Sequence, residues 1–214
     1  MKMKSSFHTK LWAVALVLAL ALGVQAAGAS PVDAALDRDQ EFLDSLADLA
    51  DRMERGQLNG EWFFHEMDRL YVRFAPDFVP VDLDSVTQQQ KKRSRSLKNR
   101  KTELEIKLYK LGFSPDPETG RFSVVYKILN LDADSPMDIL LDQFEAFLIT
   151  VASAMDLLSY RLISEDEVVL LFNHMAEDME TSYHDFNYDE VTEEQLQRLQ
   201  QLEQRMNRLA QQFY

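Results

Sequence analysis

The chain has 214 residues, no cysteine and a formal net charge of −13 at pH 7. This acidity argues against general binding of nucleic acid, because phosphate contacts depend on Lys and Arg. The lack of cysteine excludes a disulfide framework and lipid attachment through a cysteine at a cleavage site.

The N-terminal segment has the three parts of a secretory signal peptide. Three lysines stand among the first ten residues, an apolar run follows over 11–24, and small residues come next. The apolar run is shorter than the roughly 20 residues that span a bilayer, which favours a cleaved leader over an uncleaved anchor. Cleavage fits after residue 26 or after residue 29, so we expect a leader over 1–26 or 1–29 and export to a bacterial periplasm or the medium.

Residues 30–214 have the length of a single domain, in which we detect no internal repeat. Ser30-Pro31 predicts a helix start with a capping serine and proline at the first helical position. Apolar residues recur from there at helical spacing as far as Met53. A second, shorter helix is expected after Asn59-Gly60.

Three consecutive aromatic residues, Trp62, Phe63 and Phe64, stand at the start of the second predicted helix. Successive residues on a helix point about 100° apart, so the three side chains cannot all face one core. At least one should lie at a groove or an interface. The trio is therefore a candidate interaction surface.

One basic segment falls in the third predicted helix, which runs from about Ser85 to Gly112. We interpret this basic patch as a solvated helix face, since no aromatic residues are interleaved with it. Two alternatives are docking on the protein's own acidic segments and contact with anionic lipid, so membrane contact is expected to be peripheral at most. The patch comprises Lys91, Lys92, Arg93, Arg95, Lys98, Arg100 and Lys101.

A small β element is expected after this helix. Turn-forming residues fill 114–120, and apolar residues then alternate at Phe122, Val124, Tyr126 and Ile128. Alternation of this kind is typical of a half-buried strand, which predicts a minor β-hairpin near 113–128.

Ser135-Pro136 predicts the start of a helix that continues to Tyr160 and is apolar nearly all round. We expect this helix, 136–160, to be central and buried. Its Glu145 and Asp156 should then be half buried, with Arg121 and Arg161 available as partners. A buried carboxylate can act as a general acid or base, although structural pairing is the commoner role.

The next predicted helix, which begins with a capping box at Ser164, carries a candidate metal site. Imidazole and carboxylate groups on one helix face can hold a divalent ion. The order of residues differs from that of di-iron bundles, and a polar outer face is the simpler interpretation, so we predict no cofactor. The candidate ligands are His174, Glu177, Asp178 and His184.

The last predicted helix, 192–214, has a narrow apolar seam of the kind that coiled coils use. We predict that it protrudes and pairs with a helix of a partner or of a second copy of the chain. The alternative is that it packs along 136–160 of the same chain. The seam residues are Leu199, Leu202, Met206 and Leu209.

Together these patterns predict a mainly α fold, a bundle of about five helices around 136–160. The leading functional interpretation is a non-enzymatic envelope protein that binds another protein or assembles with itself. One alternative is a metal-binding protein or metal-dependent enzyme centred on His174, and another is a secreted toxin or effector. We assign no catalytic residue and expect no nucleic-acid partner.

Overall fold

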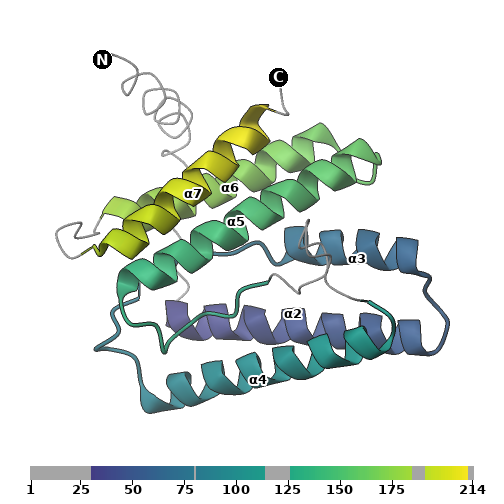
Figure 1. The fold of residues 1–214 in the computed structure, drawn as a ribbon, viewed down its shortest axis with the longest axis horizontal. Helices are drawn as coiled ribbons and strands as arrows, with labels where there is room; N and C mark the ends of the chain where they lie inside the picture. The colour runs from purple at the N-terminus through teal and green to yellow at the C-terminus, as the bar shows by residue number, and fades with distance from the viewer. Residues whose placement is uncertain (1–29, 80, 114–125, 185–190, 212–214) are drawn as a thin grey trace.

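The computed structural model describes residues 30–79, 81–113, 126–184 and 191–211, so the expected leader lies outside the described part. The described ranges are mainly helical, as predicted, and contain no strand. None of their helices combines the length and the apolarity that crossing a bilayer requires. The six helices are α2 (Pro31–Glu54), α3 (Gly60–Arg73), α4 (Gln88–Lys110), α5 (Pro136–Ser159), α6 (Glu165–His184) and α7 (Glu193–Gln211) (Figure 1).

The hairpin expected near 113–128 is not supported. Residues 114–125 lie outside the described part, and the residues from Tyr126 to Asn130 follow an irregular path. Their polar atoms bond to helices instead of a second strand: the Leu129 N–H donates to Asp39, and the Leu129 carbonyl accepts from Ser94. The apolar pattern therefore reflects burial of an irregular segment between helices.

The six helices are two copies of one three-helix unit, offset by a constant number of residues. Each helix of the second unit starts 105 positions after its counterpart in the first. The start moves from Pro31 in α2 to Pro136 in α5, from Gly60 in α3 to Glu165 in α6, and from Gln88 in α4 to Glu193 in α7. No insertion or deletion separates the three helix starts of one unit from those of the other. The expectation that the chain has no internal repeat is therefore wrong.

The two units also share their capping chemistry. Ser30 and Ser135 each cap a helix that begins with proline, and the hydroxyl of each accepts the N–H of the aspartate three residues later. Helices α4 and α7 both begin with a Thr-x-x-Gln capping box. After the first helix of each unit, Gly56 and Arg161 both have positive φ, 67° and 57°. Local sequence thus sets the same helix starts twice.

Within each unit, the first helix packs against the other two. Helix α2 contacts α3 and α4, α5 contacts α6 and α7, and the units join where α3 packs on α5. Helices α2 and α4 run in the same direction (Figure 1). Three ion pairs between them show this, since from one pair to the next the residue number rises by seven on both helices. These pairs are Asp37–Arg93, Asp44–Arg100 and Asp51–Lys107.

Helices α2 and α5 differ in how much of their surface is buried, because they have different neighbours. Helix α5 contacts three helices and is buried over most of its surface, whereas α2 contacts two. At the α5 positions of Ala146 and Ile149, both buried, α2 carries the exposed acids Glu41 and Asp44. The first unit therefore keeps a polar outer face, as the terminal unit of a repeat protein does.

Candidate functional site

Among the described residues, the most deeply buried charged side chain is that of Asp39, which lies on the apolar face of α2. Its carboxylate accepts two hydrogen bonds, from Tyr126 Oη at 2.9 Å and from the Leu129 N–H at 2.8 Å. Burial raises the pKa of Asp39 to about 6, although Arg38 and the two hydrogen bonds act in the opposite direction. The same burial, together with the Asp39 charge, raises the pKa of Tyr126.

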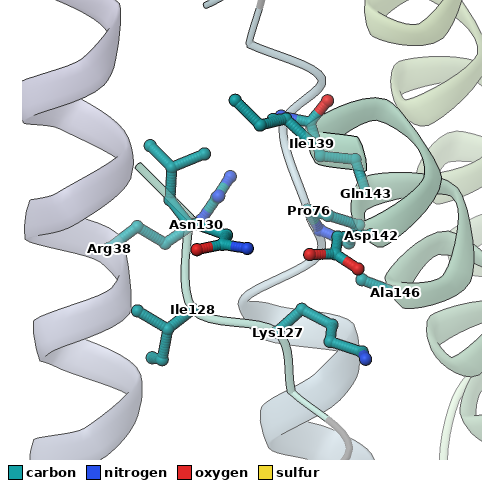
Figure 2. Close-up of a pocket in the computed structure, with 10 residues that line it drawn as sticks. Arg38, Pro76, Lys127, Ile128, Asn130, Ile139, Asp142, Gln143 and Ala146 are labelled. Atoms are coloured by element: carbon teal, nitrogen blue, oxygen red, sulfur yellow. The ribbon is translucent and has the colours of Figure 1, made fainter. Parts of the chain in front are cut away.

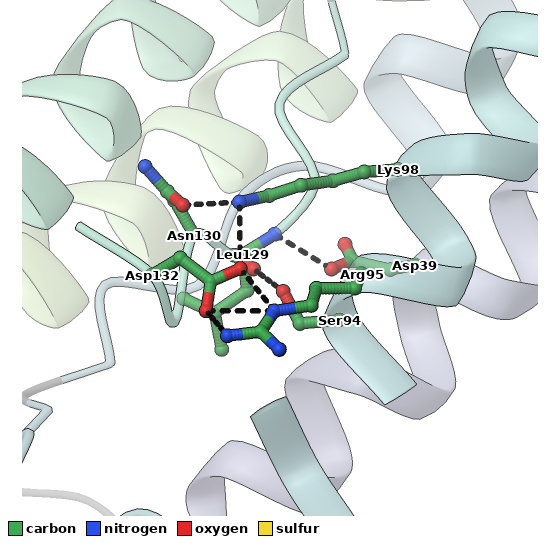
Figure 3. Close-up of polar contacts among 7 residues, drawn as sticks. All are labelled: Asp39, Ser94, Arg95, Lys98, Leu129, Asn130 and Asp132. Carbon is green, nitrogen blue, oxygen red and sulfur yellow. Dashed lines mark hydrogen bonds and ion pairs between the residues drawn. The ribbon is translucent and has the colours of Figure 1, made fainter. Parts of the chain in front are cut away.

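Helix α4 holds the same irregular segment from its other side (Figure 3). Ser94 Oγ donates to the Leu129 carbonyl at 2.7 Å, and Arg95 forms a two-pronged ion pair with Asp132. Lys98 donates to Asn130. Since Asp39 has no exposed surface, a substrate cannot reach it, and we assign this cluster to fixing the segment between α2 and α4.

A small cavity lies between α2, this segment and α5 (Figure 2). Arg38, Asn130 and Gln143 contribute polar groups to its lining, and its volume of about 20 Å³ fits one water molecule. Arg38 forms an ion pair with Asp77, while its Nε is buried without a hydrogen-bond partner among the described residues. A cavity of this size suits solvation of Arg38 and is too small for a substrate.

The two carboxylates expected on the central helix differ in their surroundings. Glu145 forms ion pairs with Lys127 at 3.1 Å and with Arg198 at 3.0 Å, not with Arg161. Burial opposes its ionisation, but these two cations lower its pKa below the ordinary value. Asp156 is half buried, and Arg121 lies outside the described part. Glu145 is thus an ion-paired structural acid.

The structure brings no metal-binding group together in the part that it describes. His174 and Glu177 are exposed on α6, and the side chains of Asp178 and His184 lie outside the described set. Among the described residues, no three His, Asp or Glu side chains lie close enough to share an ion. The metal hypothesis gains no support from this region.

The basic patch of α4 contacts the protein's own acids. Besides Arg95 and Lys98, which pair with Asp132, Arg93 and Arg100 reach α2, and Lys101 pairs with Glu105 one turn along. Lys92 is exposed and Lys91 half buried. Docking on an acidic segment of the same chain therefore occupies much of the patch.

The seam of α7 packs on α5 within the same chain. Leu202 is buried, and Leu199, Met206 and Leu209 pack around it in a cluster with Phe144 and other α5 side chains. Polar contacts fix the register, because Gln195 donates to Asp138 at 2.9 Å and Arg198 to Asp142 at 2.6 Å. This intramolecular packing covers the face expected to recruit another helix.

The aromatic trio divides between core and surface, as the 100° spacing predicts. Phe63 is fully buried, whereas Trp62 is 48% and Phe64 42% exposed. His65 links Trp62 to the end of α5, with its ring centroid 5.7 Å from that of Trp62 and 4.8 Å from that of Tyr160, which is 63% exposed. We call Trp62, Phe64, His65, Phe113 and Tyr160 the aromatic surface.

Sequence reasoning missed Asp39, although a signal was present. The apolar stripe of α2 passes through Leu36, Asp39, Phe42 and Leu43, and a charged residue within such a stripe is expected to have a buried partner. Tyr160 was also missed. Its exposure at the end of α5 has no local sequence signal.

Comparison with known proteins finds no family model, no curated protein and no solved structure that matches this chain. Its function must therefore be inferred from its own residues and surfaces.

Proposed function

We propose that the chain is an exported cell-envelope protein that binds another protein through its aromatic surface and has no catalytic activity of its own. The observation that carries this proposal is the exposure of Trp62, Phe64 and Tyr160, of which Trp62 and Tyr160 both contact the ring of His65, while Phe64 contacts Phe113. Trp and Tyr are the residues most enriched at the energetic centres of protein interfaces.

The place of the aromatic surface supports a binding role. Its residues come from the start of α3, the end of α4 and the end of α5, close to where the two units pack together. Phe113 fixes one side, with its ring centroid 4.4 Å from that of buried Phe63 and 6.0 Å from that of Phe64. Anchors held by a packed core lose little conformational entropy when they bind.

Two further features belong to the proposal. The N-terminal lysines and the apolar run over 11–24 support export with removal of a leader. We also propose that all six described helices act as one bundle around α5, which would present the aromatic surface as a rigid patch.

Site-specific photo-crosslinking in cells tests the binding role. A photoreactive residue in place of Trp62 should give a discrete adduct, whereas the same residue at Ile106, which is also exposed, should not. An adduct of twice the chain mass would identify the partner as a second copy. No adduct, or equal adducts at both positions, would contradict the proposal.

Mass spectrometry of the exported protein should show an N-terminus at residue 27 or 30.

A further inference from the structure

Helix α6 is the equivalent of α3 in the second unit, but it has fewer neighbours. Helix α3 is packed on two sides, by α2 and by α5. Among the described helices, only α5 packs extensively on α6, in the position that α2 takes on α3. The second unit therefore has no described counterpart of the packing between α3 and α5.

The residues that mark the missing contact can be named through the 105-residue offset. On α3, the ring of His65 contacts Tyr160, and the Tyr71 carbonyl accepts from Thr150 Oγ1 at 3.4 Å. Their equivalents on α6 are Leu170 and Ala176. Leu170 is 71% exposed and its neighbour Val169 56%, so an apolar pair stands at the start of the uncovered face.

The charges around this pair restrict the partner that could cover it. Asp166, Glu167 and Glu177 are exposed on α6, and no Lys or Arg occurs anywhere in the helix. A second copy of the chain would offer α6 itself in a symmetric pair, or the outer face of α2 where it repeated the packing of α5 on α3. The α2 face carries Glu41 and Asp44, and Asp44 already pairs with Arg100 of its own chain, so either of these two arrangements would bring acidic faces together.

We propose that the outer face of α6 binds a basic amphipathic helix of another protein, seated on α6 as α5 is seated on α3. Val169 and Leu170 supply the apolar contact, and the surrounding acids select Lys and Arg on the partner. This site goes beyond the proposed function, shares no residue with the aromatic surface and does not depend on the partner that binds there.

Fluorescence anisotropy with the full mature protein tests the site. The probe is a labelled helical peptide with leucine on one face and lysine on the other, and a peptide with glutamate in place of lysine is its control. The lysine peptide should bind, and replacement of both Val169 and Leu170 by glutamine should weaken binding about tenfold. The double variant Ile106→Gln/Tyr109→Gln removes a comparable exposed pair on α4 and should leave binding unchanged.

A charge variant supplies the second measurement. The double variant Asp166→Lys/Glu177→Lys should bind the lysine peptide more weakly and the glutamate peptide more tightly than the wild type does. Equal loss in the α6 and α4 glutamine variants would assign binding to the net charge of the chain and overturn the proposal. Unchanged binding after Val169→Gln/Leu170→Gln, or loss of a cooperative melt in that variant, would overturn it as well.

Discussion

Arg198 holds Asp142 across α7 and α5, with Nη2 2.6 Å from Oδ1. Its counterpart in the first unit is Arg93, which pairs with Asp37 across α4 and α2. The two ion pairs occupy equivalent positions but differ in exposure, since the side chain of Asp142 is 21% exposed and that of Asp37 61%. Because water screens a half-buried pair less, the same contact should contribute more in the second unit.

Substitution of these two arginines by methionine, which keeps much of the apolar contact, should show this difference. We expect Arg198→Met to lower the free energy of unfolding by about 1–2 kcal/mol, and Arg93→Met by about 0–1 kcal/mol. Urea denaturation at neutral pH measures both. Arg198 also pairs with Glu145, whereas the equivalent neighbour of Arg93 is the neutral Gln40. Equal losses would mean that neither the burial of the acceptor nor this second acid sets the strength of the pair.

The three ion pairs between α2 and α4 predict a salt-dependent stability. Replacement of Arg93, Arg100 and Lys107 by glutamine should lower the melting temperature slightly at low salt, since exposed ion pairs each contribute little. The loss should shrink as the salt concentration rises, because exposed charges are then screened. Thermal melts of the wild type and the variant at low and high salt test this. A loss of the same size at both salt concentrations would assign it to packing.

The helices could be predicted because their signals are local. Ser-Pro pairs fix the starts of α2 and α5 through contacts within one turn, and the prediction of these two helix starts followed from them. The repeat could not be seen as easily. Seven of the fourteen residues in 30–43 recur 105 positions later, but the later parts of α2 and α5 diverge. They diverge because one outer face meets water and the other meets α3.

The candidate surface was predictable only in part, for a similar reason. The helical angle between Trp62, Phe63 and Phe64 is a local property, so their division between core and surface followed from the sequence. His65 and Tyr160 join the surface through a contact between positions far apart in the chain, which periodicity does not reveal. The α7 seam shows the same limit, since its pattern fits packing on α5 as well as on a second chain.

Asp39 predicts a distinctive pH dependence. Its pKa is about 6 in the folded chain and about 3.9 when unfolded, so between these values the folded state binds more protons than the unfolded state. Stability should therefore fall as pH rises from about 4 to 6, with a total cost of about 3 kcal/mol above that range. The charged and titratable groups that face Asp39 are Arg38, Asp77 and Tyr126.

The variant Asp39→Asn removes this titration and keeps an acceptor for the Leu129 N–H. Relative to the wild type, its free energy of unfolding should rise by about 2 kcal/mol between pH 4 and pH 7. Denaturant titrations across this range measure the difference. Asp37→Asn, at an exposed position on the same helix, serves as the control. A difference independent of pH would show that Asp39 does not titrate with a raised pKa.

Gly56 and Arg161 occupy equivalent positions, and we expect their substitution by alanine and by glycine, respectively, to change the stability of the protein in opposite directions. Both have positive φ, a conformation that costs a residue with a side chain about 1–2 kcal/mol and glycine almost nothing. Gly56→Ala should destabilise the protein by about 1 kcal/mol through backbone strain alone, since no atom lies within 4 Å of an added Cβ. Arg161→Gly should stabilise it by about 0.5 kcal/mol after the added entropy of the unfolded chain is subtracted. Thermal melts should move in opposite directions, and shifts of the same sign would contradict the shared turn.

The packing of α7 on α5 predicts the result of removing α7. Truncation after Val191 deletes buried Leu202 and three partly buried side chains of its cluster, which together contribute on the order of 5 kcal/mol. This is comparable to the whole stability of a typical domain, so the truncated protein should lose its cooperative melt and aggregate.

A matched pair of point variants on α7 separates packing from general damage to the helix. Leu202 is 7% and Leu196 45% exposed. We expect Leu202→Gln to lower the free energy of unfolding by about 2–4 kcal/mol and Leu196→Gln by less than about 1 kcal/mol. If the α7 face does not join two chains, the molecular mass that light scattering gives for the wild type and for Leu196→Gln should not change when the sample is diluted. If the truncated chain instead stays monomeric with an unchanged melt while the full chain is a dimer, the seam joins two copies, and its contacts with α5 do not hold the fold together.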